Sequence, residues 1–307
     1  MFTDVVVGVD DREVGHDAIT LARTLLAPAG RLTLAHVLTN EPYVFRGAAG
    51  RYAADNWARA AELEEEERAL ALLERARDEA RLSELGVELT LRHVRSLSVG
   101  RGLHELAETV RADLLVLGSS RQSLLGHAVI RDDTRAALTG APCAVAIAPA
   151  GYSEHPRVMR EVGVGYDGSA ESEYAVDVAR ELADEWGAKL SAFTAVSVPT
   201  SAFGPGPRPL TDAINALVSR ANERIATLGG VEPHAAYGTA AEELAIYSAS
   251  LDLLIVGSRD YGPIGRLIHG STSVRLARTA RCALLVLPRR SGLTEGKHRH
   301  AVAVAEV

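Results

Sequence analysis

An internal repeat constrains the fold of this chain more than any other feature of its sequence. The segment Asp113–Ser119, which reads DLLVLGS, recurs as Asp252–Ser258, which reads DLLIVGS, at an offset of 139 residues. The same offset continues without a gap and relates three further identical pairs: Gly126 with Gly265, Cys143 with Cys282, and Pro149 with Pro288. Because self-similarity over such a stretch means that one structural unit occurs twice, the sequence predicts two copies of one domain.

The two copies differ in length between their matching ends. Val5–Asp10 pairs with Val162–Asp167 at an offset of 157 residues, so the first copy is 18 residues longer. Residues 40–85, which include the acidic run Glu62–Glu67, predict a longer helical insert there. The matching part of the second copy contains Gly204–Pro209, which predicts a loop. We interpret the acidic run as a solvated helix face, with a partner-docking surface as the alternative.

The length of 307 residues suits two domains of ordinary size. We expect a first domain over residues 1–150 and a second over 157–290. The linker falls near Gly151–Pro156, and the polar residues 291–307 predict a poorly ordered tail.

Short apolar runs rich in Val, Leu and Ile alternate with segments of helical spacing. This pattern predicts an α/β fold with a parallel sheet that is covered on both faces. The first copy has predicted strands at 4–9, 31–37, 87–94, 113–118 and 143–148, and predicted helices at 15–27, about 55–84, 100–110 and 132–139. The second copy has predicted strands near 161–166, 189–196, 231–237, 252–257 and 283–287.

Charge and composition exclude several classes of protein. The formal net charge is −7 and no dense Lys/Arg run precedes the tail, so nucleic acid is not an expected partner. No apolar stretch approaches the roughly 18 residues of a membrane span, and the N-terminus lacks the basic start of a signal peptide. Cys143 and Cys282 show no metal or disulfide spacing; we expect buried small side chains, with a redox role as the alternative. The sequence therefore predicts a soluble cytoplasmic protein.

Two clusters in the second copy have the residue types of a phosphate site. Gly257-Ser258-Arg259-Asp260 follows a predicted strand, and after nine residues Gly270-Ser271-Thr272-Ser273 opens a helix. Glycine lets a phosphate approach the backbone, and the N–H groups and hydroxyls of a first helical turn bind anionic oxygen. Asp167-Gly168-Ser169 follows the first strand of this copy and places a carboxylate, an acceptor for an adenine amine or a ribose hydroxyl, at the same edge. The alternative is that these are ordinary turn and helix-capping residues.

The spacing Gly-x2-Gly-x9-Gly-Ser/Thr after the fourth strand, with an Asp after the first, resembles that of the ATP-binding universal stress protein family. The Gly-Ala-Pro-Cys at 140–143 also fits, and the resemblance covers residues 2–289. It implies two tandem doubly wound, Rossmann-like sheets of five parallel strands in the order 3-2-1-4-5, with helices on both faces. It further implies that some members bind ATP and that the two domains pair through their fifth strands.

Carried over to the second copy, the resemblance assigns Asp167, Gly168 and the backbone of Val196 to the adenosine end. Gly257, Ser258, Arg259, Gly270, Ser271 and Thr272 would then hold the phosphates. Asp260 stands where the family has its second Gly, and its charge would repel a triphosphate unless Mg²⁺, Arg259 or Arg266 offsets it.

The first copy departs further from the family pattern. Asp10, Val37, Gly118 and Ser119 remain, but Arg121 replaces the second Gly and Arg131-Asp132 replaces the Gly-Ser pair. We therefore predict that this copy binds ATP weakly or not at all. In the alternative interpretation, Arg121 and Arg131 act as phosphate clamps.

The resulting functional prediction is an ATP-binding stress-response or regulatory protein, with its site mainly in the second copy and with homo-oligomers expected. A ligand-free interaction or scaffold protein is the second hypothesis and a slow ATPase the third, because no nucleophile–base pair is evident. Asp10-Asp11 also resembles a response-regulator receiver, but that domain needs an Asp after the third strand and a Lys after the fifth, where this chain has His93 and Pro149.

Overall fold

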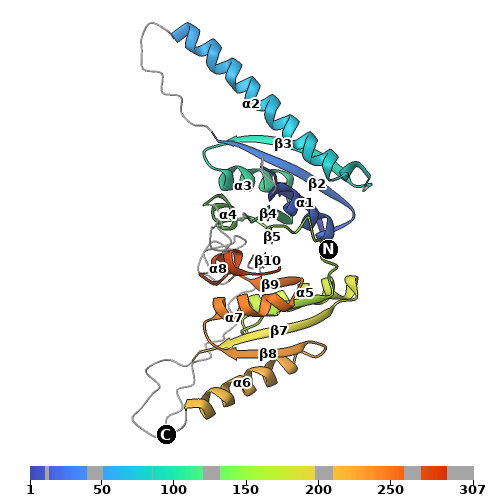
Figure 1. Ribbon diagram of the computed structural model, residues 1–307, viewed down its shortest axis with the longest axis vertical. Coiled ribbons are helices and arrows are strands. Elements are labelled where there is room, and N and C mark those ends of the chain that lie inside the picture. The colour runs from blue at the N-terminus through green and yellow to red at the C-terminus, as the bar shows by residue number, and fades with distance from the viewer. Residues whose placement is uncertain are drawn as a thin grey trace.

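The computed structural model describes residues 1–10, 14–39, 51–84, 86–119, 132–197, 210–258 and 271–288. These residues form an elongated α/β molecule in which the first half of the chain lies at one end and the second half at the other (Figure 1). No helix of the described part is both long and apolar enough to cross a bilayer.

Each half alternates strands with helices, as the sequence pattern predicts. The first half contains β1 (Phe2–Gly8), α1 (Val14–Leu25), β2 (Leu26–Thr39), α2 (Arg51–Glu79), the 3-10 helix η1 (Leu82–Glu84), β3 (Glu88–Ser96), α3 (Val99–Val110), β4 (Leu114–Gly118), α4 (Asp132–Leu138) and β5 (Ala144–Ala148). The second half contains β6 (Glu161–Gly165), α5 (Ala170–Trp186), β7 (Lys189–Val196), α6 (Leu210–Ala226), β8 (Glu232–Tyr237), α7 (Ala240–Tyr247), η3 (Ser248–Ser250), β9 (Leu253–Gly257), α8 (Ser271–Thr279) and β10 (Ala283–Leu287).

The strands form one sheet of ten in the order β3-β2-β1-β4-β5-β10-β9-β6-β7-β8. Within each half the strands are parallel and the predicted order 3-2-1-4-5 is confirmed. This order differs from the 2-1-3-4-5 order of receiver domains, which removes that alternative. The halves join where β5 pairs antiparallel with β10, with Ala146 opposite Leu285.

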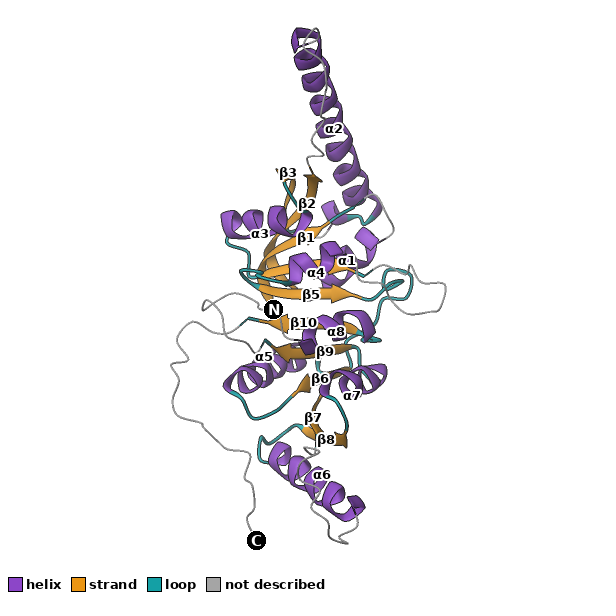
Figure 2. Cartoon of the chain, turned by 90° about the vertical axis from the view of Figure 1, so that its left-hand side faces the viewer, coloured by secondary structure: helices purple, strands orange, loops and turns teal. Residues whose placement is uncertain are grey.

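Helices cover both faces of the sheet (Figure 2), and one apolar core lies beneath them on each face. In β1, Val5 and Val7 belong to the core beneath α1, α2, α5 and α6, whereas Val6 belongs to the core beneath α3, α4, α7 and α8. Both faces of each central strand are thus buried, which explains the continuous apolar runs. Both cores contain residues of both halves. Cys143 and Cys282 lie in the second core as free thiols, so their predicted burial is confirmed.

The boundary between α1 and β2 differs from the prediction. The sequence suggested a helix over 15–27 and a strand from 31, but α1 ends at Leu25 and β2 begins at Leu26. Pro28 explains the difference, because a proline disfavours helical backbone in the residue before it and cannot continue a helix.

The longer insert of the first half is a long helix. α2 has 29 residues, against 17 in α6, and extends past β3 at the edge of the sheet (Figures 1 and 2).

The acidic run Glu62–Glu67 of α2 is only partly exposed to solvent. Arg95 of β3 forms ion pairs with Glu65 at 3.3 Å and Glu66 at 3.2 Å, and donates to the backbone oxygen of Glu62 at 2.9 Å.

The connection between the halves is fixed by a buried carboxylate. Asp17 of α1 accepts hydrogen bonds from the backbone N–H of Gly151 at 2.8 Å and of Ser153 at 2.7 Å, and from the Ser153 hydroxyl at 2.7 Å. On the other side, Arg157 donates to the backbone oxygen of Leu251 at 2.8 Å. The linker is therefore held by both halves.

Candidate functional site

A crevice opens at the carboxyl ends of β6 and β9, the two neighbouring strands from which the chain leaves in opposite directions through the sheet. This is the switch point at which doubly wound sheets bind ligands. The crevice has a volume of about 350 Å³ and is lined by Gly165, Tyr166, Asp167, Ser169, Ser172, Phe193, Ala195, Ala240, Leu244, Val256, Gly257, Thr272 and Ser273. Its lining divides into a polar part and an apolar part.

The turn from β6 into α5 forms the first polar wall. Gly168 has φ of 81°, a left-handed conformation that favours glycine. The Asp167 carboxylate accepts from the backbone N–H of Ser169 at 2.8 Å. Ser169 in turn caps α5 by accepting from the N–H of Ser172 at 3.2 Å. The carboxylate is therefore held in place beside two hydroxyl groups.

Tyr166 anchors the same turn from behind. Its backbone oxygen accepts from the Thr194 hydroxyl at 2.7 Å, and the Arg224 guanidinium lies 5.7 Å from the centre of its ring. Burial raises the pKa of the Tyr166 phenol above its ordinary value, and the nearby Glu173 carboxylate adds to the rise. The residue is thus a neutral, fixed support for Asp167.

Gly257 brings the end of β9 against the first turn of α5. A Cβ at this position would lie 2.6 Å from the backbone oxygen of Glu171, so no side chain fits without a shift of the backbone. The next residue, Ser258, is buried and its N–H donates to the backbone oxygen of Leu287 at 2.9 Å. The close packing explains why glycine stands at the end of β9.

The first turn of α8 forms the second polar wall, to which Thr272 and Ser273 contribute. Ser271 is the first residue of α8. The predicted site residues Arg259 and Gly270, together with Asp260 and Arg266, lie outside the described residues. The part of the predicted phosphate loop that the structure describes therefore borders the same crevice as Asp167.

The apolar part of the lining comes partly from β7. Val196 does not line the crevice, and its backbone oxygen accepts from the N–H of Gly238 at 3.0 Å. Ala195 lines it instead. Gly165 pairs with Phe193 in β7 as Gly8 pairs with Ala35 in β2, so Ala195 is the counterpart of Val37.

Sequence reasoning also missed other lining residues, chiefly Phe193, Ala240, Leu244 and Val256. The alternation of side chains along β7 could have indicated Phe193, since it points to the same face as Ala195.

The region of the first half that matches the crevice has similar backbone hydrogen bonds but different side chains. The N–H of Ser119 donates to the oxygen of Ala148 at 2.9 Å, as Ser258 does to Leu287. Asp10 follows β1 and Gly118 ends β4, as predicted. Val37 is buried, and a Cβ at Gly102 of α3 would lie 2.8 Å from it. Arg121 and Arg131 lie outside the described residues, and Asp132 is the first residue of α4.

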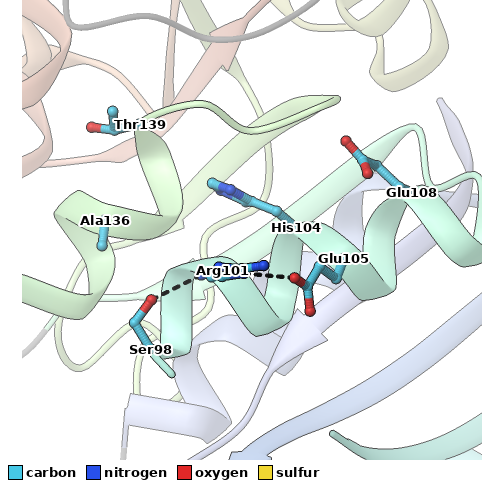
Figure 3. Close-up of a pocket in the computed structure, with 7 residues that line it drawn as sticks. All are labelled: Ser98, Arg101, His104, Glu105, Glu108, Ala136 and Thr139. Atoms are coloured by element: carbon cyan, nitrogen blue, oxygen red, sulfur yellow. Dashed lines mark hydrogen bonds and ion pairs between the residues drawn. The ribbon is translucent and has the colours of Figure 1, made fainter. Parts of the chain in front are cut away.

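A second hollow of about 430 Å³ lies between α3 and α4, lined by Ser98, Arg101, His104, Glu105, Glu108, Ala136 and Thr139 (Figure 3). Arg101 pairs with Glu105 at 2.7 Å, and His104 bonds the backbone oxygen of Ala137 at 2.6 Å. Arg101, Glu105 and His104 are thus bonded within the protein, whereas the buried hydroxyl of Thr139 has no hydrogen-bond partner among the described residues. Among the described residues, no group of three or more His, Cys, Asp or Glu side chains could hold a metal ion.

Comparisons with known proteins place this geometry in a family context. The model of the universal stress protein family matches residues 1–149 and 159–288. A universal stress protein of Mycobacterium tuberculosis is 25% identical over 223 residues, which cover 66% of this chain and 73% of that protein.

Two solved structures share the fold over almost the whole chain. A universal stress protein from Archaeoglobus fulgidus has a TM-score of 0.58 at 15% identity and covers 93% of this chain and 98% of its own. A Pseudomonas aeruginosa protein of unknown function has a TM-score of 0.59 at 17% identity and covers 94% of this chain and 93% of its own.

Proposed function

The chain belongs to the universal stress protein family, and we propose that it acts as a regulator by binding an adenine nucleotide, foremost ATP, in the crevice of its second half. The observation that supports this most directly is the meeting of three elements at one switch point: the Asp167 turn, the end of β9 at Gly257, and the first turn of α8. The sequence predicts that all three take part in binding.

The lining of the crevice suits the parts of a nucleotide. Apolar side chains such as Phe193 and Leu244 offer a surface for a base, and the Asp167 carboxylate offers an acceptor for ribose hydroxyl groups. The hydroxyls of Thr272 and Ser273, at the positive end of the α8 dipole, suit phosphate oxygens. Mg²⁺ would enter with the phosphates, since proteins often hold it through substrate phosphates and few carboxylates.

We also propose that the second half is the main site. The first half keeps Asp10 and Gly118, but its counterpart of Ala195 is the bulkier Val37 and its counterpart of Phe193 is Ala35. The β2 wall of the first half thus lacks an aromatic surface at that position.

The first experiment is to look for nucleotide that copurifies with the protein. With two Trp and eight Tyr in the chain, protein absorbance is modest, so bound nucleotide visibly alters the ultraviolet absorbance ratio. Chromatography after acid release identifies the base and the number of phosphates. Absence of bound nucleotide, together with no heat of ATP binding in calorimetry, would favour the ligand-free scaffold.

A matched pair of variants tests the asymmetry. Asp167→Asn keeps an oxygen for the Ser169 N–H but removes the charge, so ATP affinity should fall about tenfold. Asp10→Asn makes the same change in the first half and should leave the affinity unchanged. Equal losses from both variants would refute the assignment to the second half.

A slow ATPase remains the other candidate activity. Phosphate release followed over hours, with the Asp167→Asn variant as background, distinguishes turnover from binding alone.

A further inference from the structure

The floor of the crevice carries an aromatic ring that the first half lacks. Phe193 of β7 occupies the position of Ala35, and two residues further on Ala195 occupies that of Val37. The second half thus has a larger side chain at one position and a smaller one beside it. The lining of the second half thus has an aromatic side chain with a small side chain two residues further along the strand.

The ring of Phe193 is held rigidly from one side. It stacks on Tyr247 of α7 with centroids 4.9 Å apart and planes inclined by 27°. The Tyr247 hydroxyl is hydrogen-bonded to that of Ser191, and a Cβ at Gly163 would lie 2.9 Å from the Tyr247 ring. Ser191 and Gly163 therefore fix Tyr247, and Tyr247 fixes Phe193.

Part of the Phe193 side chain borders the crevice. The residue is 7% exposed, and the small part of its surface that stays uncovered contributes to the crevice lining. Aromatic side chains bind bases through stacking, and the gain grows with the area of overlapping rings. A two-ring purine covers such a surface better than a one-ring pyrimidine.

We propose that Phe193 determines the specificity of this crevice for purine over pyrimidine nucleotides. This inference rests on the proposed nucleotide binding and adds the residue that reads the base. The smaller Ala195 leaves the room that the second ring of a purine requires.

The test compares affinities of the full chain for ATP and CTP, measured by calorimetry with Mg²⁺. Phe193→Leu keeps an apolar side chain but removes the ring face, and should weaken ATP binding about tenfold while CTP binding changes little. Phe2→Leu makes the same change in β1, away from the crevice, and should alter neither affinity. Thermal unfolding of each variant reports its folded state.

A second variant keeps the test decisive if Phe193→Leu does not fold. Ala195→Val introduces the residue that the first half already accommodates at this register, so the fold should persist. It fills the space beside the ring and should also reduce the preference for ATP over CTP.

The outcomes separate the two proposals. A wild-type chain that binds neither nucleotide overturns the proposed function, and this inference with it. A wild-type chain that binds ATP, with variants that keep the same ATP-to-CTP ratio, overturns the role of Phe193 alone. If the ratio of ATP affinity to CTP affinity falls toward one in both variants, the result supports the role of Phe193.

Discussion

At the scale of single residues, two glycines of the crevice differ in what surrounds them. A Cβ at Gly257 would meet backbone, with the Glu171 oxygen at 2.6 Å, whereas a Cβ at Gly165 would meet the side-chain methyl of Val256 at 3.1 Å. Backbone cannot move aside without displacing the start of α5, but a side chain can adjust.

Gly257→Ala should therefore destabilise the protein by about 2 kcal/mol, and Gly165→Ala by clearly less. Thermal unfolding followed by circular dichroism measures both. A Gly165→Ala variant that is as unstable as Gly257→Ala would contradict the close approach of β9 to α5.

The two thiols give a second prediction at this scale. Burial raises the pKa of Cys143 and of Cys282 from 9.0 to about 12. At about pH 8 each folded thiol then has roughly a thousandfold less thiolate than an ordinary cysteine, so a thiol reagent should label the chain only after unfolding.

The same shifts determine how stability depends on pH. Between pH 9 and about 12 the unfolded thiols ionise while the folded ones keep their protons, so the unfolded state binds fewer protons. The contribution is fully present below pH 9 and is lost as pH rises toward 12. Urea unfolding should show a shallower decline in a Cys143→Ala, Cys282→Ala double variant than in the wild type; parallel declines would contradict the shifts.

At the scale of elements, α2 depends on Arg95 for part of its attachment. Arg95 reaches the 62–66 segment by two ion pairs and one bond to a backbone oxygen. The ion pairs are partly exposed and contribute little to global stability, but they fix the helix locally.

Arg95→Ala should accelerate amide hydrogen exchange in residues 60–68 about fivefold, with a small change in global unfolding. Arg92→Ala, an exposed position on the same strand, is the matched control. Exchange that stays at the wild-type rate in Arg95→Ala would show that packing alone holds this part of α2.

Elements were predicted better than the contacts between them. Periodicity and the repeat indicated every strand of the part of the chain that the structure describes, because central strands buried on both faces are continuous apolar runs. The backbone of Val196 stays a prediction: Ala195, the residue before it, lines the crevice, and which strand residue faces a site depends on pairing with the neighbouring strand. The stack of Phe193 on Tyr247 joins residues 54 positions apart, and no local pattern indicates it.

At the scale of the whole molecule, the two halves share both cores and one sheet, and the linker is held between them. Asp17 is 4% exposed and accepts three hydrogen bonds from the 151–153 turn. A carboxylate within a helix gave no sign of this role in the sequence, because its partners lie more than 130 residues away.

Asp17→Ala should lower stability by about 2 kcal/mol and accelerate tryptic cleavage after Arg157. Ser153→Ala removes one of the three bonds and should cost about 1 kcal/mol or less. The urea midpoint and the cleavage rate measure the two effects. Equal effects from both variants would mean that the backbone bonds to Asp17 contribute nothing.

The antiparallel junction of β5 and β10 has a directional consequence. All strands of one half run opposite to those of the other, so the carboxyl ends of the two halves lie on opposite rims of the continuous sheet. The proposed site of the second half therefore opens on one rim, while the equivalent region of the first half faces the opposite rim. The molecule is thus two-sided, and a protein that docks beside the proposed nucleotide site would leave the opposite rim accessible.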